Sequence, residues 1–313
     1  MNARKQKCPC CGSNKIEIIY DGLGDKTYFV GGKFSMIQCK DCKFEFINPL
    51  LSEKELVKYY PKTEYYSFQN KNTLALKYHK LSAKYYSKQN RLLNFLLYPV
   101  KPLLYTYYLD KGKNLLEIGC GDGLKLGIYQ KYGIETYGLE PYGSKLTKEE
   151  KKLGISRKTI SKANYKKGRF DYIILKEVLE HVPNQKDVLN KCYFWLKDGG
   201  KLMITVQNAK GLWKKIFKEN WFGYDVPRHL YNYNTKNIGG FLEKYGFKVN
   251  KIRAYDNPYM FVGSLQYFLD SKKPDKDHRW VFSNAMKLIT TPLSLGVSYL
   301  GMGSLMEIEC EKK

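Results

Sequence analysis

The chain is poor in arginine and histidine for a protein of its charge. Its 313 residues carry a formal net charge of +24, yet only seven of the 54 basic residues are arginines, and the chain has four histidines. Arginine is the side chain best suited to reading bases and to pairing with phosphate through two parallel hydrogen bonds. Because the excess is mostly lysine spread along the whole chain, a biased overall composition explains much of the charge. The charge alone therefore does not indicate a nucleic-acid-binding protein.

Long uninterrupted apolar runs are also lacking. The two best stretches, 92–109 and 285–306, are both broken by proline and lysine, whereas a spanning helix needs about 20 predominantly apolar residues. We expect buried or interfacial helices there. Met1–Lys7 is polar and is followed at once by cysteines, so we expect no signal peptide and a cytoplasmic protein. Peripheral contact with the inner face of the membrane is an open alternative, and 43% apolar residues are enough for a substantial core.

Four of the eight cysteines form two C-x-x-C motifs. Cys8 and Cys11 make the first motif, and Cys39 and Cys42 make the second after 27 intervening residues. In a cytosolic protein this spacing indicates a metal rather than disulfides, and four thiolates complete the tetrahedral shell of structural zinc. Cys10 lies between the first pair, which leaves a register swap open, and unrelated free thiols are the other alternative. We predict a small structural zinc ribbon.

The richest motif is NLLEIGCGDGL, at Asn114–Leu124. An apolar strand runs through Glu117 into a loop with Gly119, Gly121 and Gly123, and helix-forming sequence follows. Glycines at such a turn let the backbone approach a ligand closely. The dinucleotide fingerprint would have its third glycine one position later, so the spacing favours another nucleoside-containing cofactor.

A second acid follows the next predicted strand. Glu140 comes after 134–139, about 20 residues beyond the glycines, where the ribose-binding acid of such folds is found. One acid, Glu117, could reach the amino end of a ligand and Glu140 its ribose. Tyr142 is a candidate for stacking on an adenine.

These residues resemble the class I S-adenosylmethionine-dependent methyltransferases, in particular a type 23-like subgroup with an N-terminal zinc ribbon. Two further blocks carry the resemblance, FDYIILKEVLEHVPN at Phe170–Asn184 and LKDGGKLMITVQN at Leu196–Asn208. The resemblance implies S-adenosylmethionine as cofactor, held by Glu117, Gly119, Gly121, Gly123, Glu140, Lys176 and Glu177. The sequence departs from the family pattern in two places. The segment 155–167 holds no acid for adenine recognition, and Lys176 stands where smaller or polar residues are common.

Two of the four histidines lie in informative places. His181 ends the run EVLEH, and His229 lies in the block NWFGYDVPRHLYNY at Asn220–Tyr233, which resembles the substrate-side loop of a methyltransferase subgroup. A histidine suits removal of an acceptor proton near neutral pH. We predict His229 as the base and Arg228 as the ligand of a phosphate or carboxylate on the acceptor. A purely structural role for His229, and a packing or cofactor-shaping role for His181, stay open.

Strand-like and helix-like runs alternate from residue 114 onward, which predicts a Rossmann-like, seven-stranded, mostly parallel sheet with helices on both faces. The expected strands are 114–118, 134–139, 170–175, 200–206, 247–252 and 305–310, with helices at 123–132, 144–153, 185–196 and 235–245. The predicted domains are a zinc ribbon at 1–50, a helical connector at 51–112 and a methyltransferase domain at 113–313. The long segment 254–303 before the last strand is expected to fold as a helical lid that could dock on a membrane.

The predicted function is methyl transfer to a small molecule. Our leading interpretation is O-methylation of a sugar or lipid-linked glycan. The substrate rests on the resemblance. An RNA-binding or RNA-modifying methyltransferase and a non-catalytic S-adenosylmethionine-binding scaffold are the alternatives, and the scattered lysines speak against nucleic acid as a partner. We infer no obligate protein partner.

Overall fold

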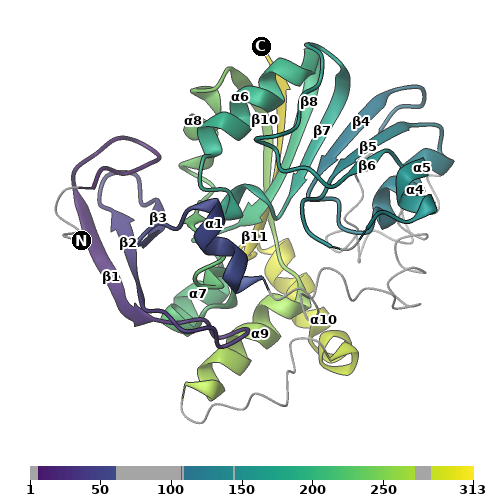
Figure 1. The fold of residues 1–313 in the computed structure, drawn as a ribbon. Helices are drawn as coiled ribbons and strands as arrows, with labels where there is room; N and C mark the ends of the chain where they lie inside the picture. Colours follow the sequence, from purple (N-terminus) through teal and green to yellow (C-terminus); the bar gives the residue numbers. More distant parts are fainter. Residues whose placement is uncertain (1–5, 61–106, 108, 144, 272–282) are drawn as a thin grey trace.

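The computed structural model describes residues 6–60, 107, 109–143, 145–271 and 283–313 (Figure 1). Its strands form a seven-stranded sheet in the order β10-β11-β8-β7-β4-β5-β6 and a four-stranded sheet in the order β1-β2-β3-β9. The strands of the large sheet are β4 (Asn114–Ile118), β5 (Glu135–Leu139), β6 (Ile155–Ser156), β7 (Phe170–Lys176), β8 (Leu196–Gln207), β10 (Phe247–Tyr255) and β11 (Leu305–Lys312). Those of the small sheet are β1 (Ile16–Leu23), β2 (Phe34–Cys39), β3 (Glu45–Asn48) and β9 (Tyr231–Asn232).

The large sheet is parallel through its centre and antiparallel at one edge. Strand β4 lies between β5 and β7, and β6 and β8 extend this parallel core on either side. Strand β11 runs antiparallel to both β8 and β10. The arrangement confirms the predicted Rossmann-like, mostly parallel sheet of seven strands.

Both faces of the large sheet are buried. On β7, Ile173 and Leu175 belong to one buried cluster, whereas Tyr172 and Ile174 belong to the other, because successive side chains of a strand point to opposite faces. The covering helices are α4 (Leu124–Lys131), α5 (Lys148–Lys152), α6 (Gln185–Trp195) and α8 (Ile238–Glu243). Figure 1 shows α6 and α8 on one side of the sheet and α4 and α5 on the other, as helices on both faces require.

Most expected elements occur within a few residues of their predicted bounds. Helix α5 begins later than expected because Thr147 caps it: the Glu150 amide donates to Thr147 Oγ1 at 3.1 Å, and Glu150 Oε2 accepts from the Thr147 amide at 2.8 Å. Strand β8 begins at Leu196, before the predicted start at residue 200. Strands β6 and β9 are not predicted by the sequence, since strands of two residues are too short to show periodicity.

The N-terminal sheet is completed from the far end of the chain. Strand β9 pairs antiparallel with β3, so that Phe46 lies opposite Tyr231, and Phe44 packs its ring against Tyr233 at 4.9 Å between centroids. After β3 the chain forms the short helices α1 (Glu53–Leu56) and η2 (Val57–Tyr59). Most of the predicted helical connector, 51–112, lies outside the described residues. The domain boundaries at 50 and 112 stay predictions.

The predicted helical insertion before the last strand is present. Helices α9 (Pro258–Asp270) and α10 (Asn284–Tyr299) lie between β10 and β11 and pack on each other. Ahead of β9, the chain forms α7 (Leu212–Phe217), η6 (Lys218–Asn220) and η7 (Phe222–Tyr224). Across the described residues, none of the helices combines the length and apolar character needed to cross a membrane.

Candidate active site

The glycine loop between β4 and α4 has the backbone that its sequence predicts. Gly119, Gly121 and Gly123 have φ values of 73°, 58° and 76°, in the left-handed region that favours glycine. Space is also limiting, because a Cβ on Gly119 would lie 2.4 Å from Val178 Cγ2. The loop therefore holds its shape through glycine and packs directly against the loop that follows β7.

Glu117 presents a buried carboxylate beside this loop. It is 3% exposed, and among the described residues its Oε2 has no hydrogen-bond partner. Lys125 Nζ lies 3.8 Å from Oε1, and burial raises the pKa of the carboxyl despite this cation. A buried hydrogen-bond acceptor without a partner costs free energy, unless a bound ligand donates a hydrogen bond to it. The arrangement suits a ligand that brings an ammonium or hydroxyl donor.

Glu140, directly after β5, connects the glycine loop to the turn that follows β5. Its Oε2 accepts from the Gly121 amide and its Oε1 from the Tyr142 amide, both at 3.0 Å. The residue is 7% exposed, and burial raises its pKa although both amides favour the charged form. Each carboxylate oxygen can accept a second hydrogen bond, so a diol of a bound ribose could share this group.

Lys176 and Glu177 lie at the carboxyl end of β7. Burial, reinforced by Lys125, lowers the pKa of Lys176 to about 7, so about half of its amine is uncharged at pH 7 and most of it is uncharged only above that pH. Glu177 has a φ of 53° and accepts from Tyr259 Oη at 2.9 Å, so the insertion helix α9 reaches the same end of the sheet.

The two predicted histidines are brought together. The rings of His181, on the short helix η5 (Leu179–His181), and His229 lie 4.6 Å apart between centroids. His181 Nδ1 is 3.1 Å from the Arg228 carbonyl oxygen, and His229 Nδ1 is 2.8 Å from the Gly223 carbonyl oxygen. Since a carbonyl only accepts, the contact with Gly223 places the proton of His229 on Nδ1 and leaves Nε2 as its basic nitrogen, whereas His181 Nδ1 has both a carbonyl and the Tyr60 hydroxyl as neighbours.

Both imidazoles are neutral. Burial, followed by the neighbouring His229, lowers the pKa of His181 to about 3, and burial also lowers the pKa of His229 despite the nearby Asp225. His181 Nδ1 is also 3.0 Å from Tyr60 Oη, and the Tyr60 ring stacks on Tyr142 at 5.1 Å. The histidine pair is thus connected through Tyr60 to the turn that Glu140 holds.

Glu180 completes this cluster, and the sequence analysis did not select it. It is fully buried, and neither carboxylate oxygen has a hydrogen-bond partner among the described residues. Burial, with the charge of Glu177 second, raises its pKa to about 8, so the carboxyl is protonated at neutral pH. One ligand atom each from Glu180, His181 and His229 lie within 4.8 Å of one another. Two imidazoles and a carboxyl in this arrangement can relay a proton or bind a metal ion.

Arg228 is fully buried and uses all five of its N–H groups inside the protein. Its Nε and Nη2 donate to Asp225 at 2.8 and 2.5 Å, Nη2 and Nη1 donate to Asp25 at 2.8 and 3.1 Å, and Nη1 donates to the Tyr59 carbonyl at 3.3 Å. Burial alone would raise the pKa of Asp225, but the guanidinium holds it well below its usual range. In this arrangement Arg228 has no donor left for the acceptor anion that the sequence analysis assigned to it. It positions the loop that carries His229.

Asp25 belongs to the turn between β1 and β2, so the ion pair joins the N-terminal sheet to the histidine loop. The Thr27 amide donates to Asp25 Oδ1 at 2.9 Å, and the Thr27 hydroxyl donates to Asp225 Oδ1 at 2.6 Å. Tyr224 Oη donates to Glu45 Oε2 at 3.0 Å across the same junction. No local sequence signal marks these pairings, because the partners lie about two hundred positions apart.

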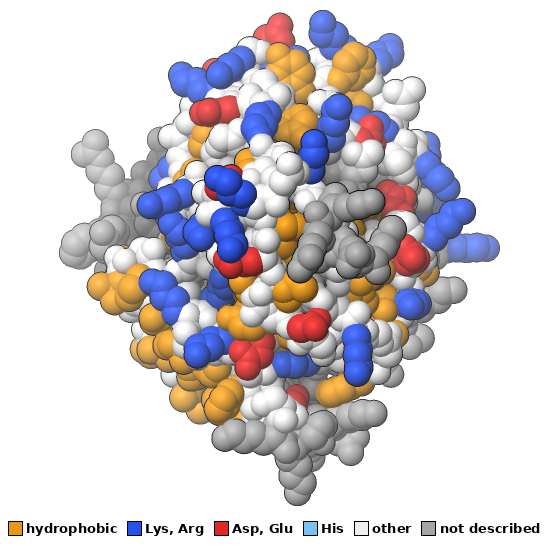
Figure 2. Space-filling model, turned by 90° about the vertical axis from the view of Figure 1, so that its left-hand side faces the viewer, with side chains coloured by type: hydrophobic (Ala, Val, Ile, Leu, Met, Phe, Trp, Pro, Cys, Tyr) orange, Lys and Arg blue, Asp and Glu red, His pale blue; other side chains and the backbone are white. Residues whose placement is uncertain are grey.

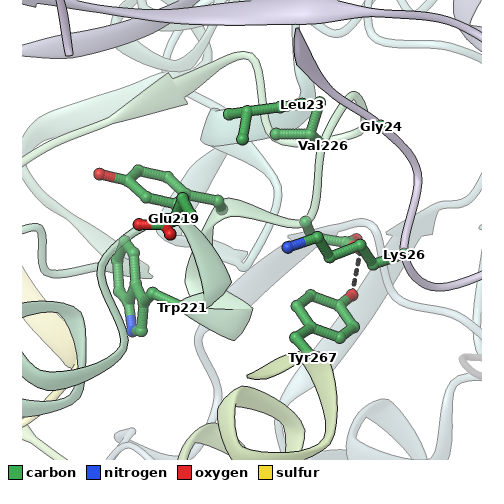
Figure 3. Close-up of a pocket in the computed structure, with 9 residues that line it drawn as sticks. Leu23, Gly24, Lys26, Glu219, Trp221, Val226 and Tyr267 are labelled. Atoms are coloured by element: carbon green, nitrogen blue, oxygen red, sulfur yellow. Dashed lines mark hydrogen bonds between the residues drawn. The ribbon is translucent and has the colours of Figure 1, made fainter. Parts of the chain in front are cut away.

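A small cavity of about 10 Å³ lies at this junction (Figure 3). Lys26 and Tyr267 line one side of it, and Glu219 and Trp221 line the other. It has room for about one water molecule, so it cannot hold a methyl acceptor.

A sequence profile of the methyltransferase domain family matches residues 86–252, more than half of the chain. The chain belongs to this family. The ubiquinone biosynthesis O-methyltransferase of Bradyrhizobium sp. (strain ORS 278) is 28% identical over an alignment of 162 residues, and the match covers 45% of this chain and 62% of the relative. The phosphoethanolamine N-methyltransferase of Plasmodium falciparum (isolate 3D7) is 30% identical over an alignment of 130 residues, and the match covers 38% of this chain and 49% of the relative. The chain spans about half the length of these curated relatives.

Among solved structures, a 1,6-didemethyltoxoflavin-N1-methyltransferase of Burkholderia thailandensis, with S-adenosylhomocysteine bound, is similar to this chain. Its sequence identity is 10%, its TM-score is 0.45, and the match covers 91% of this chain and 98% of that chain.

The methyltransferase domain fits S-adenosylmethionine, the cofactor that its family supports. The partnerless Glu117 oxygen suits the amino group of the methionine part, and Glu140 suits the ribose hydroxyls. Gly119 is exposed and Gly121 is half-buried, so a ligand can reach the backbone at these two glycines. The roles of Glu117, Gly119, Gly121, Gly123, Glu140, Lys176 and Glu177 stay predictions that agree with this geometry.

The four predicted zinc ligands form a cluster at one end of the small sheet. The Sγ atoms of Cys8 and Cys42 lie 3.6 Å apart, as do those of Cys11 and Cys39, and all four lie within 4.8 Å of one another. A tetrahedral zinc ion with bonds of about 2.3 Å needs sulfurs roughly 3.8 Å apart. Cys10 is not part of this cluster, so the predicted register fits zinc without a swap.

Proposed function

We propose that the chain is an S-adenosylmethionine-dependent methyltransferase that methylates a hydroxyl oxygen of a small molecule, with sugars and lipid-linked glycans as the first candidates. The observation that carries the proposal is the pair of neutral imidazoles at the edge of the sheet that carries the glycine loop, in which His229 Nε2 makes no hydrogen bond to the described residues. An oxygen acceptor has to lose its proton during methylation, and a neutral imidazole is the ordinary protein base for that task.

The proposal assigns a role to each group. When bound, S-adenosylmethionine supplies a methyl group on a sulfonium, which is already a good leaving group. His229 Nε2 takes the proton from the hydroxyl group that is methylated, and the Gly223 carbonyl fixes the orientation of the ring through Nδ1. His181, held by the Arg228 carbonyl, and the protonated carboxyl of Glu180 place polar atoms next to that ring. Orientation of the acceptor oxygen by these groups can supply much of the rate acceleration.

The charge distribution supports a small-molecule acceptor over RNA. Figure 2 shows Lys and Arg side chains mixed with Asp and Glu over the visible face, instead of gathered into one basic stripe. Nucleic-acid-binding proteins concentrate basic residues on one face or along one element.

We also propose that the cysteine cluster binds one structural zinc ion. The tetrathiolate would leave no position open for substrate, so the metal would act by fixing the ends of β2 and the N-terminal turn. Support comes from the sulfur spacing and from the presence of all four Sγ atoms within 4.8 Å of one another.

The proposed reaction is tested with His229→Gln. Calorimetric titration with S-adenosylmethionine, with NAD as the control ligand, measures cofactor binding, and radiolabelled methyl transfer to pools of nucleotide sugars, lipid-linked glycans and RNA identifies the acceptor. We expect cofactor affinity to be unchanged in the variant and transfer to fall about 10²- to 10⁴-fold. Because burial lowers the pKa of His229, the loss of transfer that protonation of this base causes should have its midpoint below pH 6.5. Full transfer by the variant would contradict the assigned base, and an absence of cofactor binding would contradict the function.

A further inference from the structure

Helix α10 packs with its polar side against the protein and its apolar side outward. Its buried residues are Thr290, Ser294, Val297 and Ser298. Its large apolar side chains are instead exposed, and they continue to the residue after the helix: Leu288 is 74% exposed, Ile289 71%, Leu293 44%, Tyr299 51% and Leu300 70%. These positions recur at helical spacing and fall on one side of the helix. The usual amphipathic pattern of a helix on a globular protein is therefore reversed.

One hydrogen bond ties the inward side of α10 to the rest of the protein, and two others satisfy its hydroxyl groups within the helix. Thr290 Oγ1 donates to the Met286 carbonyl and Ser298 Oγ to the Ser294 carbonyl, both at 2.7 Å. The Asp256 amide donates to Ser298 Oγ at 2.8 Å, which anchors the helix to the end of β10. The outward apolar side is thus a feature of the packed fold.

Neighbouring helices add to the exposed apolar surface. Phe268 and Leu269 on α9 are each 38% exposed, and Ile216 on α7 is 55% exposed. Helix α9 packs on both α10 and α7. Of the thirteen large apolar side chains that are exposed in the described part of the chain, eight belong to α7, α9 and α10 with its following residue. Apolar surface concentrated in this way marks an interaction site.

Charge distinguishes between a second copy of this chain and a lipid surface as the partner that covers the exposed apolar side chains. Helix α10 contains no acidic residue, Lys215 and Lys218 are exposed beside Ile216, and the whole chain carries +24. A second copy of this chain would bring the same charge and be repelled at long range. An anionic lipid surface would be attracted, and it accepts the apolar side chains that water does not.

We propose that the α9–α10 insertion docks on an anionic membrane surface, with α10 lying in the plane of the interface. The residues from Leu288 to Leu300 extend about 18 Å along the helix and would place their apolar side chains among the lipid acyl chains. Tyr259, on α9, contacts Glu177 at the carboxyl end of β7, so the insertion that carries the docked face also touches the proposed active site. The inference goes beyond the proposed reaction and does not depend on it.

The test is flotation of the full chain with phosphatidylglycerol vesicles and with phosphatidylcholine vesicles. Wild-type protein should float with the anionic vesicles only, and Leu288→Asp/Ile289→Asp should weaken binding about tenfold or more, because two inserted apolar side chains are lost. The matched control is Ile18→Asp, which replaces a 49% exposed apolar residue of β1 and should bind like wild type. Circular dichroism and S-adenosylhomocysteine titration check that each variant is folded.

Four outcomes would overturn the proposal. They are no flotation of the wild type, equal binding to both vesicle types, unchanged binding by the folded double variant, or a wild-type dimer in sedimentation equilibrium that the double variant abolishes without any vesicle binding. A second folded variant, Leu300→Asp, separates loss of one inserted side chain from a local defect at Leu288, and it should bind more weakly than wild type. Flotation needs neither cofactor nor acceptor, so its failure leaves the proposed reaction standing.

Discussion

The two ends of the proposed active site are built in different ways. At the cofactor end, Glu117 and Glu140 lie at the ends of adjacent strands, and Glu140 holds the glycine loop through backbone amides. At the histidine end, His181 and His229 come from separate loops that meet through Arg228, whose ion pairs reach into the N-terminal sheet. The first end is local in sequence and the second is assembled over long distances.

The difference teaches that cofactor binding and methyl transfer can fail separately. Damage to the N-terminal sheet should reach the histidines, because Asp25 and the Tyr59 carbonyl hold the arginine whose own carbonyl orients His181. Glu117 and Glu140 make no such contact with that sheet in the hydrogen bonds of the described residues. A change at one end should therefore alter either cofactor affinity or methyl transfer, and both quantities have to be measured for each variant.

The largest effect is expected from removing the proposed zinc. Structural zinc in small domains contributes about 10–16 kcal/mol of apparent binding free energy, so a chelator should unfold the N-terminal sheet and abolish transfer. Cofactor affinity should change far less. Thermal unfolding, methyl transfer and calorimetric titration are measured before and after chelation. Cys39→Ser should reproduce the loss, while Cys10→Ser should keep one zinc per chain. Unchanged melting and activity after verified metal loss would contradict the assignment.

A smaller effect is expected from Arg228→Met. The substitution leaves Asp25 and Asp225 buried without their cation, which should lower the free energy of unfolding by about 3–5 kcal/mol and disorder the His229 loop. Urea unfolding and transfer rates measure the change. The control is Arg253→Met, because Arg253 pairs with Glu307 at 2.6 Å near the surface and should cost about 1 kcal/mol or less. Equal losses in the two variants would show that the buried network has no special role.

The fold and the cofactor end could be predicted because their signals are local. The period of the apolar residues gave the order of strands and helices, and three glycines after Glu117 marked the loop. The histidine end could be predicted only in part. The sequence placed His181 and His229 in loops, but the buried pairing of Asp25 with Arg228 joins residues 203 positions apart, and β9 has only two residues. Without those contacts, the sequence predicts Arg228 as a substrate ligand. It also does not single out Glu180, although this residue belongs to the same EVLEH run as His181.

The smallest effect is expected at the cofactor end, from Glu140→Gln. The amide nitrogen of glutamine cannot accept from the Gly121 or Tyr142 amide, so one of the two loop contacts is lost, together with the charge that favours ribose hydroxyls. Loss of hydrogen bonds to a charged group should weaken S-adenosylhomocysteine binding by about 1–2 kcal/mol, roughly tenfold. Glu135→Gln, an exposed change at the start of the same strand, is the control. Methyl-transfer rates at saturating acceptor would then separate the two ends: the rate should recover when the cofactor concentration is raised, because the histidine network is intact. If transfer stayed low at saturating cofactor, Glu140 would act on both ends, and the independence of the two ends would be wrong.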